Sequence, residues 1–123
     1  MRWLRLLTLL ASLTVAACAE PEMPEPILFQ VPTQAPDPAG NKACMAALLI
    51  GTLVIDPRWG LAVAPADAPV MKVVWPNGYV GRHLDGVTEL LDGRGHVVAR
   101  AGDQIEVGGG IGAADDPTWF ACG

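Results

Sequence analysis

Serine and lysine are scarce in this sequence of 123 residues. Serine occurs once, at Ser12, and lysine twice, at Lys42 and Lys72. Serine hydrolases and most enzymes that form a Schiff base need one of these side chains as the nucleophile. The three cysteines show no CxxC spacing and none lies next to a histidine, which argues against a zinc site. We therefore expect no enzyme activity, no catalytic residue and no cofactor.

The first 17 residues have the pattern of a secretory signal peptide. Arg2 and Arg5 precede the short apolar run Leu6–Leu13, and small residues follow it. This order of positive charge, apolar stretch and small residues is typical of a signal peptide. Residues 6–17 are too few for a transmembrane helix, which needs about 20 apolar residues. We predict that residues 1–17 are a cleaved leader.

The residues at the predicted cleavage point, Val15-Ala16-Ala17-Cys18, resemble the lipobox of bacterial lipoproteins. In that pattern two aliphatic or small residues and one small residue precede a cysteine. The resemblance implies that the Cys18 thiol receives a diacylglycerol and that its new amino group is then acylated. Two or three acyl chains give stable anchoring, whereas one chain binds a membrane only marginally. The alternative is an ordinary secretory signal that happens to contain a cysteine.

The lipobox also implies a location in the cell envelope. Ala19 follows the cysteine, and it is not the aspartate that retains lipoproteins in an inner membrane. We therefore expect the periplasmic face of an outer membrane if the cell has one, and otherwise the outer face of the cytoplasmic membrane.

Acidic residues outnumber basic ones. The chain has 8 Lys and Arg against 13 Asp and Glu, a net charge of −5. Loss of Arg2 and Arg5 with the leader would change this to −7. An acidic surface argues against binding nucleic acid or anionic lipid head groups by general electrostatics. The expected partners are the membrane, through the lipid on Cys18, and an envelope protein or glycan.

Two cysteines remain after the leader, Cys44 and Cys122. The signal peptide directs the chain to an oxidising compartment, where thiols pair. We predict a Cys44–Cys122 disulfide that encloses nearly the whole folded region. Two separate buried thiols are the alternative.

A proline-rich segment, residues 18–41, is predicted to be a disordered tether. Proline removes a backbone donor and fixes φ, so neither helix nor sheet propagates through such a segment. Residues 19–41 could reach about 70 Å if fully extended. The apolar island Ile27–Val31 interrupts the tether. It could pair with the domain as an edge strand or lie in the membrane interface.

From residue 42 to residue 123 the pattern predicts a small all-β domain. Short apolar runs alternate with turn signals every 8 to 12 residues, as in small sandwiches and barrels. Val70–Trp75 is predicted to be one strand, with Met71, Val73 and Trp75 on one face and Lys72 on the other. The predicted turns after it are Pro76-Asn77-Gly78, Asp85-Gly86 and Asp92-Gly93-Arg94-Gly95. A long first strand, Cys44–Ile55, bends at Gly51, and Gly102-Asp103-Gln104-Ile105-Glu106-Val107 follows later. These two fragments resemble OB-type barrels. A closed or partly open β-barrel of this type is favoured because closure removes exposed strand edges, while an SH3-like barrel and a small sandwich remain open.

Three aromatic residues, Trp59, Trp75 and Tyr79, lie at predicted turns. Aromatic side chains at loop ends can stack on sugars or fill a pocket of a partner. They form the candidate binding face. The alternative is that they cap the barrel core, since tryptophan is highly buried on average.

His83, Asp85 and His96 form a second candidate site. Two histidines and a carboxylate could hold a metal ion or serve a small envelope enzyme. Their spacing matches no specific motif. We expect no metal here. The alternative to a binding or structural role is a small envelope enzyme or metal-binding protein that uses these three residues.

Overall fold

A computed structural model describes residues 23–36, 44–112 and 117–123. The predicted leader, the predicted lipobox Val15–Cys18 and the outer parts of the predicted tether lie outside the described residues. Within those ranges no helix is long and apolar enough to cross a membrane. The described chain consists of nine strands, which confirms the predicted all-β fold.

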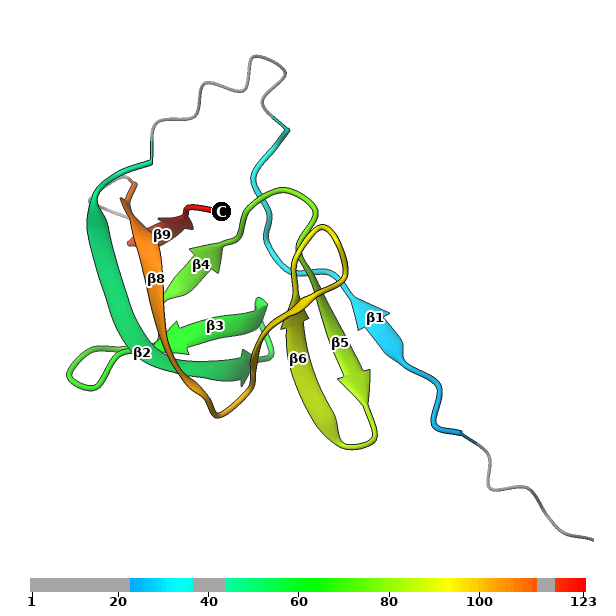
Figure 1. Cartoon of the computed structure of the whole chain (residues 1–123). Coiled ribbons are helices and arrows are strands. Elements are labelled where there is room, and N and C mark those ends of the chain that lie inside the picture. The colour runs from blue at the N-terminus through cyan, green and yellow to red at the C-terminus, as the bar shows by residue number, and fades with distance from the viewer. Residues whose placement is uncertain (1–22, 37–43, 113–116) are drawn as a thin grey trace, which may run out of the picture.

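Five strands form a barrel (Figure 1). They are β2 (Ala47–Asp56), β3 (Gly60–Ala64), β4 (Lys72–Val74), β8 (Gln104–Ile111) and β9 (Thr118–Ala121). Their order in the sheet is β3-β2-β8-β9-β4. The two outer strands meet where Val63 and Met71 exchange backbone hydrogen bonds of 3.2 and 2.8 Å. This bridge closes the sheet on itself.

The connectivity of the barrel is that of the OB type. The first barrel strand, β2, pairs with the second and fourth, β3 and β8, while the third and fifth, β4 and β9, run parallel. The first half of β2 pairs with β8 and its second half with β3, and Thr52 belongs to both ladders. Gly51 directly precedes Thr52. A Cβ atom at Gly51 would lie only 2.6 Å from the carbonyl oxygen of Ala64. Glycine therefore permits the bend that the sequence predicts there.

A second sheet consists of one strand that precedes the barrel in the chain and three strands inserted between β4 and β8 (Figure 1). Its strands are β1 (Ile27–Phe29), β5 (Val80–Leu84), β6 (Val87–Leu91) and β7 (Val97–Arg100), in the order β1-β5-β6-β7. Asp85 and Gly86 connect β5 to β6 with φ angles of 50° and 76°. Both residues tolerate positive φ, which a two-residue turn of type I′ requires.

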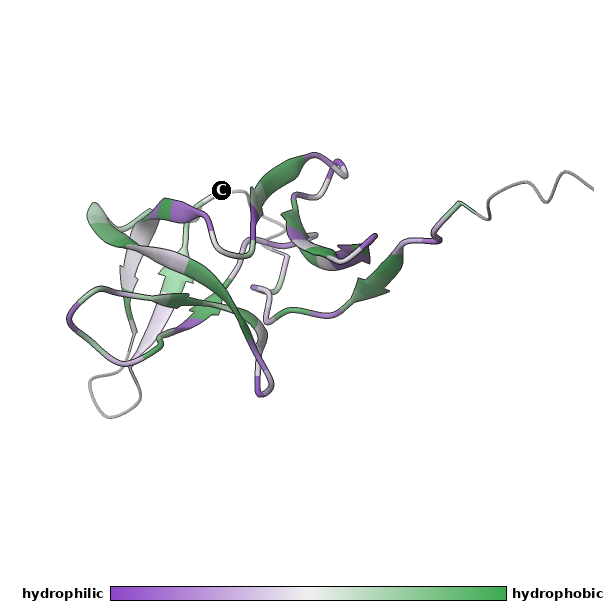
Figure 2. Ribbon diagram, turned by 90° about the horizontal axis from the view of Figure 1, so that it is seen from below, coloured by the Kyte–Doolittle hydropathy of each residue, from purple (hydrophilic) through white to green (hydrophobic). Residues whose placement is uncertain are grey.

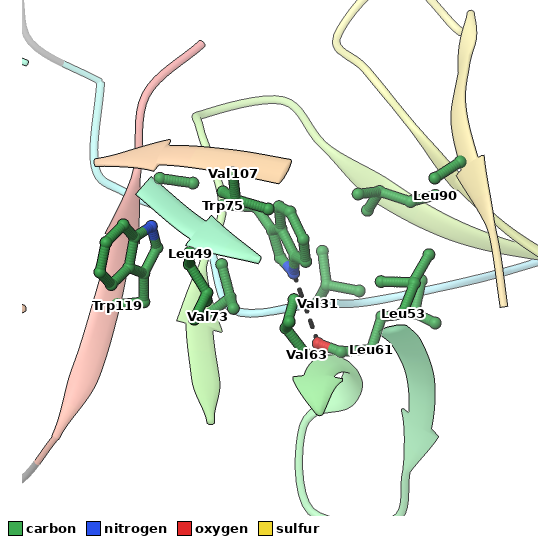
Figure 3. Close-up of a cluster of buried hydrophobic side chains, with 12 residues drawn as sticks. Val31, Leu49, Leu53, Leu61, Val63, Val73, Trp75, Leu90, Val107 and Trp119 are labelled. Carbon is green, nitrogen blue, oxygen red and sulfur yellow. Dashed lines mark hydrogen bonds between the residues drawn. The ribbon is translucent and has the colours of Figure 1, made fainter. Parts of the chain in front are cut away.

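One apolar core joins the two sheets (Figure 3). Its fully buried side chains come from both of them: Leu53, Leu61, Val63, Val73 and Leu90. Trp75 is 2% exposed, and its indole Nε1 donates a hydrogen bond of 3.4 Å to the carbonyl oxygen of Leu61. Val73 and Trp75 belong to the core and Met71 packs against it, which confirms that these three residues share one face.

The domain begins earlier than residue 42. The backbone N–H of Trp75 donates to the carbonyl oxygen of Pro32, and that of Gln34 donates to the carbonyl oxygen of Trp75, both at 2.8 Å. Val31 is 5% exposed and lies in the core. Residues 27–34, which we call the strap, are thus part of the fold.

The expectation of a tether extending to residue 41 is wrong for the strap. The edge-strand alternative for Ile27–Val31 is confirmed at Ile27–Phe29. The physical reason is that proline removes only a backbone donor. The carbonyl oxygen of Pro32 still accepts a hydrogen bond, and the apolar side chains around it are buried by packing on the barrel.

Candidate functional site

The predicted disulfide is present. Cys44, just before β2, is bonded to Cys122, just after β9, with a distance of 5.7 Å between their Cα atoms. The backbone N–H of Cys122 also donates a hydrogen bond of 2.9 Å to the carbonyl oxygen of Gly108 on β8. The disulfide therefore connects the ends of β2 and β9, the first and last barrel strands. These two strands are not neighbours in the sheet, because β8 lies between them.

The predicted aromatic face is not assembled. Trp75 lies in the core, and the ring of Tyr79 stacks on it with centroids 6.4 Å apart. Tyr79 is half-buried, and burial raises the pKa of its hydroxyl. The alternative, in which aromatic side chains cap the barrel core, describes these two residues. The turn signal Pro76-Asn77-Gly78 placed them at a loop end, but the loop folds back over the core.

Trp59 is the remaining member of the candidate face. It lies in the turn between β2 and β3 and is half-buried. The guanidinium carbon of Arg58 lies 3.9 Å from the centroid of a Trp59 ring. Such a cation over an indole face is attracted by the ring quadrupole. Trp59 therefore forms a pair with Arg58 and is not part of a three-ring platform.

Asp56 fixes this pair in place. Its carboxylate accepts hydrogen bonds from Arg58 Nε at 3.2 Å and from Nη2 at 3.1 Å, and its Oδ1 also accepts from the backbone N–H of Arg58 at 2.8 Å. The bonds from the Arg58 side chain hold the pKa of Asp56 below its ordinary value. A bidentate arrangement of this kind restricts the guanidinium to one plane. The turn thus presents a preordered, positively charged group on an aromatic ring.

The structure separates the candidate metal residues. His83 stacks on Phe29 with ring centroids 4.5 Å apart, and its Nδ1 lies 2.7 Å from Thr88 Oγ1 near the start of β6. His96 follows the other end of β6, where its Nδ1 lies 3.7 Å from Oδ2 of Asp92. Among the described residues no group of three His, Cys, Asp or Glu side chains could hold a metal ion. His83, Asp85 and His96 therefore form no common site.

A buried carboxylate was not predicted from the sequence. Glu89, 5% exposed, accepts hydrogen bonds from Arg82 Nη2 at 2.8 Å and from Arg100 Nε at 3.1 Å. The bond from Arg82, with the positive charge of both arginines, lowers the pKa of Glu89. The three residues lie opposite one another on β5, β6 and β7. Because their separations in sequence depend on two turn lengths, no local motif marks them.

A cavity of about 330 Å³ adjoins the disulfide. The described residues that line it come from the strap, the β4–β5 loop and the two ends of the barrel: Gln34, Ala35, Cys44, Met45, Pro76, Asn77, Phe120, Ala121, Cys122 and Gly123. None of these residues carries a charged side chain, and the two cysteines are oxidised. The cavity offers amide groups and apolar surface, but these side chains include no acid, base or nucleophile.

Comparison with known proteins places the chain in no family. No family model, no curated protein and no solved structure matches it.

Proposed function

We propose that this protein is a lipid-anchored protein of the bacterial cell envelope, whose barrel acts as a binding or structural module without catalysis. The observation that carries the proposal is the Cys44–Cys122 disulfide. Structural disulfides persist in oxidising compartments such as the periplasm and the cell surface. The leader and lipobox would deliver the chain to the same compartment, so two independent parts of the sequence agree.

The turn that contains Arg58 and Trp59 supports a binding role. OB-type barrels bind ligands on the face of their second and third strands and on the loop between the first and second. In this barrel that loop is the turn between β2 and β3. An arginine held over an indole ring offers hydrogen-bond donors and an aromatic surface together. A glycan or an envelope protein with acidic groups fits this chemistry, whereas the net negative charge disfavours nucleic acid.

Lipidation is tested by replacing the proposed acceptor. Cys18→Ala should abolish incorporation of labelled palmitate and leave the leader uncleaved, because the thiol is the acylated group. The variant Ser12→Ala changes the leader outside the lipobox and should be labelled like the wild type. Palmitate labelling of the Cys18→Ala protein, or a mature N-terminus at another residue, would contradict the proposal.

Binding is tested by recovery of partners from crosslinked envelopes. We expect Trp59→Ala to weaken partner binding by about 1–3 kcal/mol, since a few aromatic and arginine side chains commonly dominate an interface. Ile55→Ala is the matched control, because Ile55 is 58% exposed on β2, the strand that leads into this turn. Equal recovery with both variants would exclude the turn as the binding surface and favour a purely structural role.

A further inference from the structure

The strap limits how far the domain can lie from its proposed lipid anchor. Ile27, the first residue of β1, is held opposite His83 of β5. Nine residues of chain connect Cys18 to Ile27. Even a fully extended chain covers at most about 30 Å over nine residues. The bilayer surface would therefore lie within about 30 Å of β1, far closer than the 70 Å that a tether ending at residue 41 allows.

The end of the molecule that carries β1 is apolar. Figure 2 shows β1 in the colour of hydrophobic residues, at the side of the molecule away from the barrel. Ile27 and Leu28 are 64% and 62% exposed, and Val87, at the start of β6, is 41% exposed. Leu84, half-buried, pairs with Val87 across the turn between β5 and β6. We call Ile27, Leu28, Leu84 and Val87 the β1–hairpin edge.

Strand register places three of these residues on one face. Leu28 lies opposite Arg82, and Leu84 follows Arg82 by two residues on the same strand. Because alternate residues of a strand share a face, Leu28, Leu84 and Val87 all lie on the face that carries Arg82. The opposite face carries Phe29, which packs against the core. The edge therefore offers apolar side chains on a surface that the barrel does not cover.

The charges beside the edge suit a lipid headgroup layer. Arg82 and Arg100 flank Glu89, so these three side chains together carry one positive charge. Long arginine side chains can extend along apolar surface and keep the guanidinium among polar groups. Two polar residues near the edge are exposed to solvent: Asp85, in the turn between β5 and β6, and His83, on the other face of β5.

We propose that the β1–hairpin edge rests on the lipid surface of the membrane that carries the anchor. The inference rests on the proposed lipidation of Cys18, which fixes which end of the domain is nearest the membrane. A short tether raises the effective concentration of the edge at the bilayer, so that modest apolar contacts suffice to orient the domain. The barrel lies behind the face of β1 that carries Phe29, and the end of the Arg58–Trp59 turn is close to this strand, because a Cβ atom at Gly60 would lie 3.1 Å from the Phe29 ring.

The experiment replaces acylation by chemical coupling, so that it does not depend on processing in the cell. The chain from Cys18 onward, with its Cys44–Cys122 disulfide intact, contains every residue that the structure describes. Its Cys18 thiol is coupled to a maleimide lipid in phosphatidylethanolamine–phosphatidylglycerol vesicles. A dansylalanine probe replaces Leu28, or in the matched control Leu48, which is 55% exposed on β2 of the barrel. Emission and quenching by nitroxide-labelled lipid are then recorded.

We expect the emission at position 28 to shift to the blue on coupling and to be quenched by the nitroxide lipid. The probe at position 48 should show neither change. Val87→Ser should reduce the quenching at position 28. Val98→Ser, on the neighbouring strand β7, is the control and should reduce this quenching less. Circular dichroism melts check that each variant is folded.

Two outcomes would overturn this inference. Equal quenching at positions 28 and 48 would show that the domain tumbles without a preferred face. A blue-shifted probe at position 28 without vesicles, together with a dimer in sedimentation, would show that a second copy covers the edge. Failure of palmitate labelling at Cys18 is a separate result. It would contradict the proposed anchor but would not change the emission and quenching measured on the chemically coupled protein.

Discussion

The barrel has paired strands all the way round, whereas the four-stranded sheet ends in two open strands, β1 and β7. Open edges can pair with other chains, and short strands or charged residues usually protect them. Both open strands here are short, with three and four residues, and Arg100 lies on β7. The barrel needs no such protection, because the Val63–Met71 bridge closes it.

The two regions also differ in how they bury their residues. The barrel interior is filled by aliphatic and indole side chains, and Trp75 caps this core. The outer face of the four-stranded sheet instead buries the carboxylate of Glu89 between two arginines. Apolar burial stabilises without regard to pH, whereas a buried carboxylate stabilises only while it is ionised. The barrel and the sheet should therefore respond differently to cavities and to acid.

The largest expected effect is at Trp75, which is buried against the barrel core. Trp75→Ala should lower the free energy of unfolding by about 3–5 kcal/mol, because it removes a buried ring and leaves a cavity. Trp59→Ala, in the turn between β2 and β3, is the control and should cost less than about 1 kcal/mol. Urea unfolding followed by circular dichroism measures both. Similar losses in the two variants would mean that the Arg58–Trp59 pair is also part of the structural core.

A smaller effect is expected where the strap joins the two regions. Val31→Ala should cost about 2 kcal/mol, from the lost transfer free energy of its buried side chain and the cavity that remains. Val98→Ala, on the open strand β7 at 49% exposure, makes the same chemical change at the surface and should be nearly neutral. The comparison uses the same urea titration. If Val31→Ala were also neutral, the strap would not contribute to the stability of the fold.

The smallest effect, and one that depends on pH, is expected at Glu89. Its pKa in the folded protein lies below the ordinary value of 4.5, so its stabilising effect is present above that value and is lost as the pH falls through the folded pKa. Glu89→Gln should therefore be less stable than the wild type at neutral pH, with the difference shrinking below pH 4.5. Unfolding curves at both pH values measure it. A difference that stays constant with pH would show that the loss comes from packing and not from charge.

Much of the fold could be predicted from local patterns. The alternation of Met71, Val73 and Trp75 predicted their common inward face, and the turn signals predicted the hairpins around Asp85-Gly86 and Asp92. Gly51 predicted the bend in the first strand because glycine alone fits that approach. These predictions are correct because the physical cause of each feature lies within a few neighbouring residues.

The candidate site was predicted less well. The turn at Asn77-Gly78 suggested exposed aromatic side chains, but Trp75 and Tyr79 pack on side chains from distant strands. His83 and His96 are 13 residues apart in the sequence, yet β6 lies between them and keeps them apart. Sequence spacing across a hairpin does not give distance, because strand length and direction decide where each end lies.

The sequence by itself determined the strand pattern, the cystine pair and the acidic charge, because each depends on residue type or on near neighbours. Only the tertiary structure decided that the barrel closes, that Glu89 meets both Arg82 and Arg100, and that the strap joins the domain. These depend on contacts between residues far apart in the chain, such as the hydrogen bonds from Gln34 to Trp75 and to the carbonyl oxygen of Ala121. The proline content of the strap predicts an extended backbone, but only packing against the barrel decides whether that backbone is free or bound.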